Sequence, residues 1–262
     1  MTRIKEYKVE GVRVEAIEAA HSNDQRPPIL FVHGGCHGSW SWEKFLPYFA
    51  DAGWECHAIN WYGHNGSDPP PNGSFIQRGI AEIAEEICHV ASRFGTPPVI
   101  IGHSMGGLAS QKYAEQNAVA AMVLVASVVP KEVGGMALEI PVDMDHPWEP
   151  PSLEDASEMF FQNLTQAEAE HYHALLCAES PRAVSEATRC GVSIDRISIS
   201  GPILVLAAES DIMTPPSTGR ALADFYGADY RFLRGRGHNL LLEPRWQETA
   251  GLIVEWLNRS VA

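Results

Sequence analysis

Short apolar runs recur along the chain, each five to eight residues long and rich in β-branched or aliphatic side chains. Runs of this kind are typical of strands that are buried on both faces. The first part of the chain differs, because apolar and polar residues alternate around Gly11 over 5–19, which predicts an antiparallel hairpin at a sheet edge. The buried runs are ILFVH (29–33), WECHAIN (54–60), PVIIG (98–102), AMVLVAS (121–127) and PILVLAAE (202–209).

Segments with helical spacing of apolar residues lie between and after these runs. Strand and helix therefore alternate, which predicts a mostly parallel sheet with right-handed crossovers and helices on both faces. The segments are WEKFLPYFADAG (42–53), FIQRGIAEIAEEICHVASRFG (75–95), GGLASQKYAEQNA (106–118), STGRALADFYG (217–227) and PRWQETAGLIVEWLNR (244–259).

One long stretch, 130–200, contains no convincing buried strand. Three helix starts are predicted in it: Ser152 stands three residues before Asp155, Thr165 three before Glu168 as in a capping box, and a third helix begins near SPRAVSEATRC. We therefore divide the chain into a core, 1–129 with 201–262, and an inserted helical lid, 130–200. The proline-rich start of the lid, PVDMDHPWEPP, predicts a loop that can cover a pocket.

Composition and charge narrow the class of protein. The 262 residues are 45% hydrophobic and 20% charged, as in one large soluble domain. A net charge of −14 repels phosphate backbones and anionic lipid, so we expect neither nucleic acid nor membrane as a partner. Five scattered cysteines without CxxC spacing indicate free thiols, and no apolar leader or membrane span is evident, so we expect a cytoplasmic protein.

The sequence GHSMGG, 102–107, directly follows a predicted buried strand and precedes a predicted helix. Gly102, Ser104 and Gly106 are then the fixed positions of a nucleophile elbow. In this turn the serine takes positive φ, at a cost of about 1–3 kcal/mol. Its hydroxyl projects above a helix amino terminus, which favours developing negative charge. A chance GxSxG in a glycine-rich loop is the alternative, and the flanking elements argue against it.

With this elbow the chain resembles the α/β-hydrolase family over almost its whole length, which implies an eight-stranded type of sheet and the chain order serine, acid, histidine. Asp211, after the strand that follows the lid, is the expected acid, with Glu209 and Asp224 as rivals. His238, in a glycine-rich loop before the last helix, is the expected base.

The stretch ILFVHGGCHGSW resembles the oxyanion loop of the same family. The resemblance implies that the amides of Gly35 and Met105 bind the oxyanion of a tetrahedral intermediate. His33 and His103 are expected to be structural. Cys36, next to Gly35, is expected to border the site.

The amino-terminal third is similar to the plant methylesterase and hydroxynitrile lyase group. The lyases carry threonine after the first histidine of this loop and lysine after the catalytic histidine. This chain has Gly34 and Asn239 there, which disfavours cyanohydrin cleavage. The stretch YGHNGSDP resembles the corresponding loop of general bacterial hydrolases, so methylester specificity does not follow.

We therefore expect a serine hydrolase that cleaves a small carboxylic ester, thioester or lactone through an acyl-enzyme on Ser104, without cofactor or metal. His171 and His173 lack ligand spacing, as do the other histidines outside the site.

Trp148 and Phe160, with Met159 and Phe161, are candidates for lining an apolar substrate pocket. The alternatives are a slowly catalytic ligand receptor and a C–C or C–N lyase of the same fold. A homodimer is left open.

Overall fold

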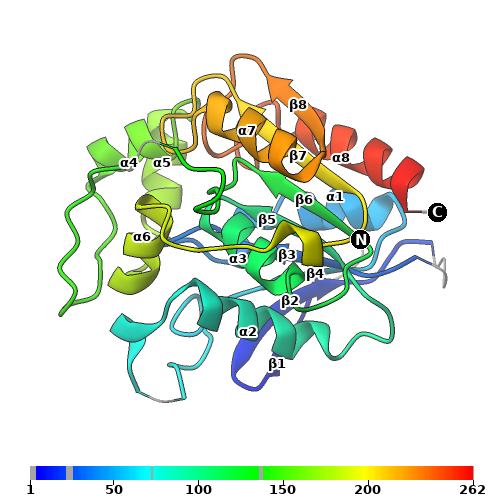
Figure 1. Ribbon diagram of the computed structural model, residues 1–262, viewed down its shortest axis with the longest axis horizontal. Coiled ribbons are helices and arrows are strands. Elements are labelled where there is room, and N and C mark those ends of the chain that lie inside the picture. The colour runs from blue at the N-terminus through cyan, green and yellow to red at the C-terminus, as the bar shows by residue number, and fades with distance from the viewer. Residues whose placement is uncertain (1–3, 22–25, 72, 136–137, 262) are drawn as a thin grey trace.

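The computed structural model describes residues 4–21, 26–71, 73–135 and 138–261. Its centre is an eight-stranded sheet in the order β1-β2-β4-β3-β5-β6-β7-β8 (Figure 1). The first two strands form the predicted hairpin and pair antiparallel, whereas β4, β3 and β5 to β8 run parallel. The strands are β1 Lys5–Val9, β2 Val12–Ile17, β3 Ile29–Val32, β4 Cys56–Ile59, β5 Val99–His103, β6 Ala121–Val125, β7 Ile203–Ala208 and β8 Asp229–Leu233.

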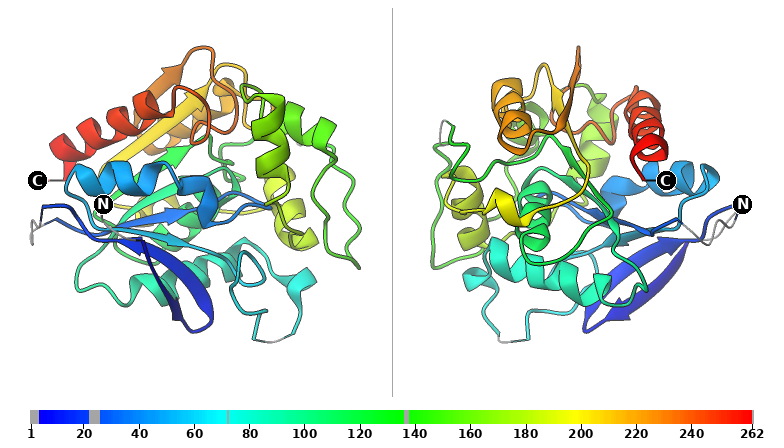
Figure 2. Two further views of the ribbon diagram at one scale, coloured as in Figure 1. Left: turned by 180° about the vertical axis from the view of Figure 1, so that it is seen from behind. Right: turned by 45° about the vertical axis from the view of Figure 1, so that its right-hand side comes forward.

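Helices cover both faces of the sheet, as predicted. Alternate strand residues point to opposite faces, so Phe31 packs with α1 and α8 in one core cluster while Leu30 packs with α2, α3 and α7 in the other. Figure 1 shows α2, α3 and α7 in front of the sheet, and the view from behind in Figure 2 shows α1 and α8. These helices are α1 Phe45–Asp51, α2 Ile80–Ala91, α3 Met105–Ala114, α7 Pro216–Tyr226 and α8 Trp246–Ser260.

Two of the predicted helices are shorter than their apolar patterns. In the segment 42–53, Trp42 is the last residue of a 3₁₀ turn, η1 Ser39–Trp42, and α1 begins only at Phe45. The segment 75–95 is divided into η2 Phe75–Gln77 and α2, because Arg78 is extended and Gly79 caps the following helix. The break at Arg78 directs its side chain into the interior, where it is buried.

The chain between β6 and β7 forms a helical insertion at one end of the sheet (Figure 1). It carries α4 Leu153–Met159, α5 Gln166–His173, α6 Pro181–Thr188 and a short η3 Arg196–Ser198, and none of the eight strands falls within its described residues. The predicted helix starts are confirmed: the side chains of Ser152, Thr165 and Ser180 accept the backbone N–H three residues on. This supports the proposed division into a core and a lid over 130–200.

Candidate active site

Ser104 stands in the turn between β5 and α3, with φ 51° and ψ −122°. Positive φ at a serine is uncommon, and the surrounding glycines explain how the turn is accommodated. A Cβ on Gly102 would lie 2.7 Å from the carbonyl oxygen of Gly106, and one on Gly106 would overlap the carbonyl oxygen of His33. Side chains at these two positions are therefore excluded, and the strand can turn sharply into the helix.

The hydroxyl of Ser104 lies 2.9 Å from Nε2 of His238. The other ring nitrogen, Nδ1, lies 3.0 and 2.9 Å from the two carboxylate oxygens of Asp211. In this arrangement Nδ1–H donates to the carboxylate, so Nε2 is free to accept the hydroxyl proton. Ser104 lies 134 residues and Asp211 lies 27 residues from His238 in the sequence. The fold brings the three side chains into a hydrogen-bonded series, serine to histidine to aspartate, which activates the serine as a nucleophile.

The Asp211 carboxylate is fixed by its own loop. It also accepts hydrogen bonds from the backbone N–H of Met213 and of Thr214, both at 2.9 Å, and from the Thr214 hydroxyl at 2.6 Å. The two rival acids have other partners: Glu209 accepts from the N–H of Gly235, and Asp224 pairs with Arg220 on the exposed side of α7. Only Asp211 of these three carboxylates contacts His238.

The loop around His238 is held by groups that the sequence analysis did not single out. Gln162, from the insertion, accepts the backbone N–H of His238 at 3.0 Å. Glu243 accepts the N–H of Gly237 at 2.6 Å and forms a buried ion pair with Arg236 at 2.5 Å. Gln162 lies 76 residues from His238 in the sequence, and Glu243 belongs to no recognisable motif, so no local sequence pattern predicts these contacts.

The loop that carries Gly35 lies against the elbow, and Gly35 and Met105 border the same cavity as Ser104. Met105 is the first residue of α3, where backbone N–H groups have no partner within the helix. Burial lowers the pKa of His37 to about 4, so its ring is neutral, with Nδ1 donating to the Gly35 carbonyl at 2.7 Å. This contact fixes the peptide that joins Gly35 to Cys36, next to the Gly35 N–H.

His33 and His103 both make structural contacts. Nδ1 of His33 donates to the Gly34 carbonyl at 2.8 Å, and Nε2 accepts the N–H of Trp61 at 3.3 Å. Burial, more than any neighbouring charge, lowers the pKa of both rings well below the ordinary value. Neutral, fully buried rings with such partners fit the packing role expected for them.

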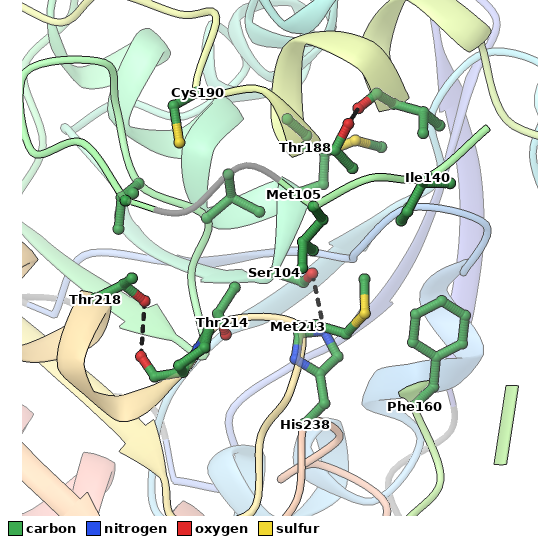
Figure 3. A pocket seen from close by; sticks show the side chains of 18 of the residues that line it. Ser104, Met105, Ile140, Phe160, Thr188, Cys190, Met213, Thr214, Thr218 and His238 are labelled. Atoms are coloured by element: carbon green, nitrogen blue, oxygen red, sulfur yellow. Dashed lines mark hydrogen bonds between the residues drawn. The ribbon is translucent and has the colours of Figure 1, made fainter. Parts of the chain in front are cut away.

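A cavity opens above Ser104 between the core and the insertion (Figure 3). The empty space between its lining atoms is about 830 Å³, part of it open to solvent. Trp148 and Phe160 lie on its wall as expected, and its described lining contains no Asp, Glu, Lys or Arg. Further apolar wall residues are Val128, Val129, Leu138, Ile140, Val184, Ala187, Met213 and Pro215.

Cys36 does not line this cavity, and the expectation that it borders the site was wrong. Its thiol is fully buried, and burial raises the thiol pKa well above the ordinary value. The reason is local: Cys36 has φ 63°, and its backbone N–H and carbonyl both bond to the insertion, at Glu179 and Cys177. The residue thus belongs to the contact between loop and insertion.

Two further structural observations concern other kinds of site. In the described ranges, no group of three or more His, Cys, Asp or Glu side chains is arranged to hold a metal ion. Nor is any helix there both long and apolar enough to span a bilayer.

Comparison with known proteins gives matches at the level of family and fold. The profile of the alpha/beta hydrolase family matches residues 29–252. Epoxide hydrolase 1 of Caenorhabditis elegans is 32% identical over 110 residues, which cover 42% of this chain and 26% of that protein. Methylesterase 9 of Arabidopsis thaliana is 27% identical over 107 residues, or 38% of this chain and 40% of that protein. The matched region is therefore less than half of either relative's length.

Solved structures resemble the chain over nearly its full length. An esterase from Rhodococcus sp. ECU1013 superposes with a TM-score of 0.70 at 19% identity, covering 100% of both chains. Naproxen esterase, a carboxylesterase from Bacillus subtilis, superposes with a TM-score of 0.71 at 16% identity, covering 97% of this chain and 92% of the other. At these identities the likeness concerns the fold.

Proposed function

The chain belongs to the α/β-hydrolase family, and we propose that it hydrolyses small, neutral carboxylic esters, or the related thioesters and lactones, through an acyl-enzyme on Ser104. The observation that carries this proposal is the 2.9 Å contact between the Ser104 hydroxyl and an imidazole whose far side is held by a carboxylate. A serine hydroxyl is a weak nucleophile at neutral pH, and this contact supplies the base that activates it.

The reaction begins when Ser104 attacks the carbonyl carbon and its proton passes to Nε2 of His238. The carbonyl oxygen becomes an oxyanion, which accepts hydrogen bonds from the N–H groups of Gly35 and Met105. Losing one such donor typically costs about 10²- to 10³-fold in rate. Asp211 stabilises the imidazolium. The intermediate collapses, Nε2 returns the proton to the leaving oxygen or sulfur, and the acyl group stays on Ser104.

Water completes the cycle. His238 takes a proton from the water as its oxygen attacks the acyl carbon, and the same proton then returns to Ser104 when the carboxylic acid leaves. Each proton taken by Nε2 is given back, so the enzyme ends in its starting state. No group besides the described side chains, two amides and water enters these steps.

The cavity supports neutral, apolar substrates. A charged acyl group or leaving group would be desolvated there without a counter-charge, which is costly. The similar solved structures include an esterase and naproxen esterase, and the curated relatives include methylesterases, so an ester panel is the natural first screen.

Two other reactions of related proteins are less well supported. The cyanohydrin lyases carry a threonine at the position of Gly34, where an added Cβ would lie 3.1 Å from Cβ of Ser104, and a lysine at the position of Asn239. Here the Asn239 amide lies 3.1 Å from Nε2 of His37, to which it donates. Epoxide hydrolases are expected to carry aspartate at the elbow, and this chain has Ser104.

The test is labelling with a fluorophosphonate, which reacts with activated serines, followed by turnover of aryl and methyl esters that differ in acyl size. We expect a single label on the peptide that contains Ser104, and turnover that the label abolishes. A labelled serine with turnover too slow to compete with spontaneous hydrolysis would favour a ligand receptor. Absence of label on a folded protein would contradict the proposal.

A further inference from the structure

Glu179 lies between α5 and α6 in the insertion, and its side chain is fully buried. A buried carboxylate is costly unless every oxygen has partners. Oε1 accepts Nη2–H of Arg78 at 2.6 Å and the N–H of Ser180 at 2.8 Å. Oε2 accepts Nε2–H of His64 at 3.0 Å and the N–H of Cys36 at 3.3 Å. One insertion residue thus joins three separate segments of the core.

The charge of this carboxylate is maintained by its neighbours. Burial alone would raise the pKa of Glu179, but His64 and Arg78 hold it well below the ordinary value. Burial alone would lower the pKa of His64, but the Glu179 carboxylate raises it to about 10. Both groups are therefore ionised at neutral pH. The negative charge of Glu179 is balanced by the positive charges of His64 and Arg78, and the same carboxylate also contacts the loop at Cys36.

The contact with Cys36 acts on the residue directly after Gly35. Cys36 has φ 63°, which an L-residue adopts only when its surroundings fix it. Those surroundings come from the insertion: Glu179 accepts its N–H, and the N–H of Cys177 donates to its carbonyl at 3.0 Å. Oε2 of Glu179 lies 3.9 Å from the place where a Cβ on Gly35 would stand, so the carboxylate lies beside Gly35, the residue whose N–H is assigned to the oxyanion.

The same residue is tied to the cavity wall. Trp148 and Glu179 exchange two backbone hydrogen bonds of 2.9 Å, as an isolated antiparallel bridge. Trp148 lines the cavity. A shift of the segment that carries Glu179 would therefore move both the wall and the loop of Gly35.

We propose that Glu179 is a positioning residue that acts on the peptide joining Gly35 to Cys36 and so holds Gly35 where its own N–H meets the oxyanion. The insertion then takes part in transition-state stabilisation as well as in forming the cavity. This inference rests on the proposed ester hydrolysis. Its physical basis is preorganisation: a donor displaced by about 1 Å loses much of its effect on a developing charge, at a cost of about 10²-fold.

Glu179→Gln tests the proposal because it keeps the size of the side chain but replaces one oxygen, and so turns an NH₂ group toward two of the four donors. We expect kcat for a short-chain aryl ester to fall about 10- to 100-fold with KM within about threefold. A trifluoromethyl ketone forms an oxyanion on the serine, so its affinity should fall by the same factor as kcat/KM. A purely structural role would not produce that proportionality.

Glu132→Gln is the matched control. Glu132 accepts the N–H of Ile194 at 3.0 Å at another place in the insertion and does not line the cavity, so kcat and inhibitor affinity should stay unchanged. If Glu179→Gln does not fold, Glu179→Asp is the second variant: it keeps the negative charge on a side chain that is one methylene shorter. The same fall in kcat and in inhibitor affinity is expected.

A folded Glu179→Gln protein with wild-type kcat and wild-type affinity for the ketone would overturn the inference. So would a loss of kcat with unchanged affinity for the ketone. The proposed function is tested separately. It would be contradicted if the Ser104→Ala protein hydrolysed the ester as fast as wild type, whatever the result for the Glu179 variants.

Discussion

Nε2 of His103 lies 3.0 Å from the backbone carbonyl oxygen of His238. The residue before the nucleophile thus holds the main chain of the base, and the two rings lie 4.9 Å apart, centroid to centroid. Burial keeps the pKa of His103 well below the ordinary value, so the ring is neutral and its Nε2–H donates. The elbow and the histidine loop are therefore fixed to each other independently of the bond between Ser104 and His238.

Replacing His103 with Phe keeps a ring in place and removes the donor. The His238 carbonyl then loses its buried partner, and leaving such a group unsatisfied costs about 1–3 kcal/mol of stability. We expect kcat to fall about tenfold or more, because the base is no longer held against the serine. Steady-state kinetics and urea denaturation check this, with His171→Phe, at an exposed position, as the control.

Replacing Gly106 with Ala should disrupt the elbow. The new methyl group would overlap the backbone carbonyl oxygen of His33, the residue directly after β3, and a backbone group cannot rotate away as a side chain can. We expect a loss of stability at or above the upper end of the roughly 1–3 kcal/mol typical of overpacking, together with loss of activity. Gly95→Ala, where a Cβ meets nothing within 4 Å, should stay within about 0.5 kcal/mol of wild type in the same denaturation experiment.

Replacing Ile140 with Trp should narrow the cavity from the insertion side. Esters with bulky acyl or alcohol groups should lose about tenfold or more in kcat/KM, whereas acetate esters of small alcohols keep theirs. A series of esters of graded size measures this selectivity. Ile197→Trp, at a side chain that is 87% exposed, should leave the whole series unchanged. Equal losses for all esters would mean that the cavity is not the substrate site.

The buried pair of His64 and Glu179 predicts a stability that depends on pH. Because the folded pKa of His64 is about 10 and its ordinary value is 6.5, its contribution is complete below pH 6.5 and is lost as the pH rises through 10. His64→Gln should cost roughly 3–5 kcal/mol at pH 6, since it removes one partner of a buried pair. Urea denaturation of both proteins should show this difference shrinking toward pH 10. A difference that stays constant would contradict the pairing.

Most of the fold can be predicted from the sequence, because β3 to β7 are buried at every position and appear as continuous apolar runs, and the hairpin strands β1 and β2 appear as an alternating pattern. The exception is β8, Asp229–Leu233, at the sheet edge, whose residues DYRFL are half-buried or exposed and include none that is fully buried. No such apolar run marks it. A strand with one paired edge and partly exposed side chains leaves a weak signal.

The residues of the site likewise fall into those that the sequence predicts and those that it does not. The elbow needs a local sequence with its own steric logic, so Ser104 can be found directly, and Asp211 and His238 follow from the order that the family resemblance implies. Glu179 and His64 carry no such pattern, because they lie 115 residues apart, and Arg78, the second cation that binds Glu179, stands at a break in the predicted helix. Contacts of this kind exist only after the chain has folded.

The central claim, that Ser104 carries the acyl group, is tested most directly by mass spectrometry of protein quenched in acid during turnover of p-nitrophenyl acetate. We predict one acetyl group on the peptide that contains Ser104, and none on that peptide in folded Ser104→Ala. An acetyl group that accumulates on another residue, or steady turnover by Ser104→Ala at the wild-type rate, would contradict the account.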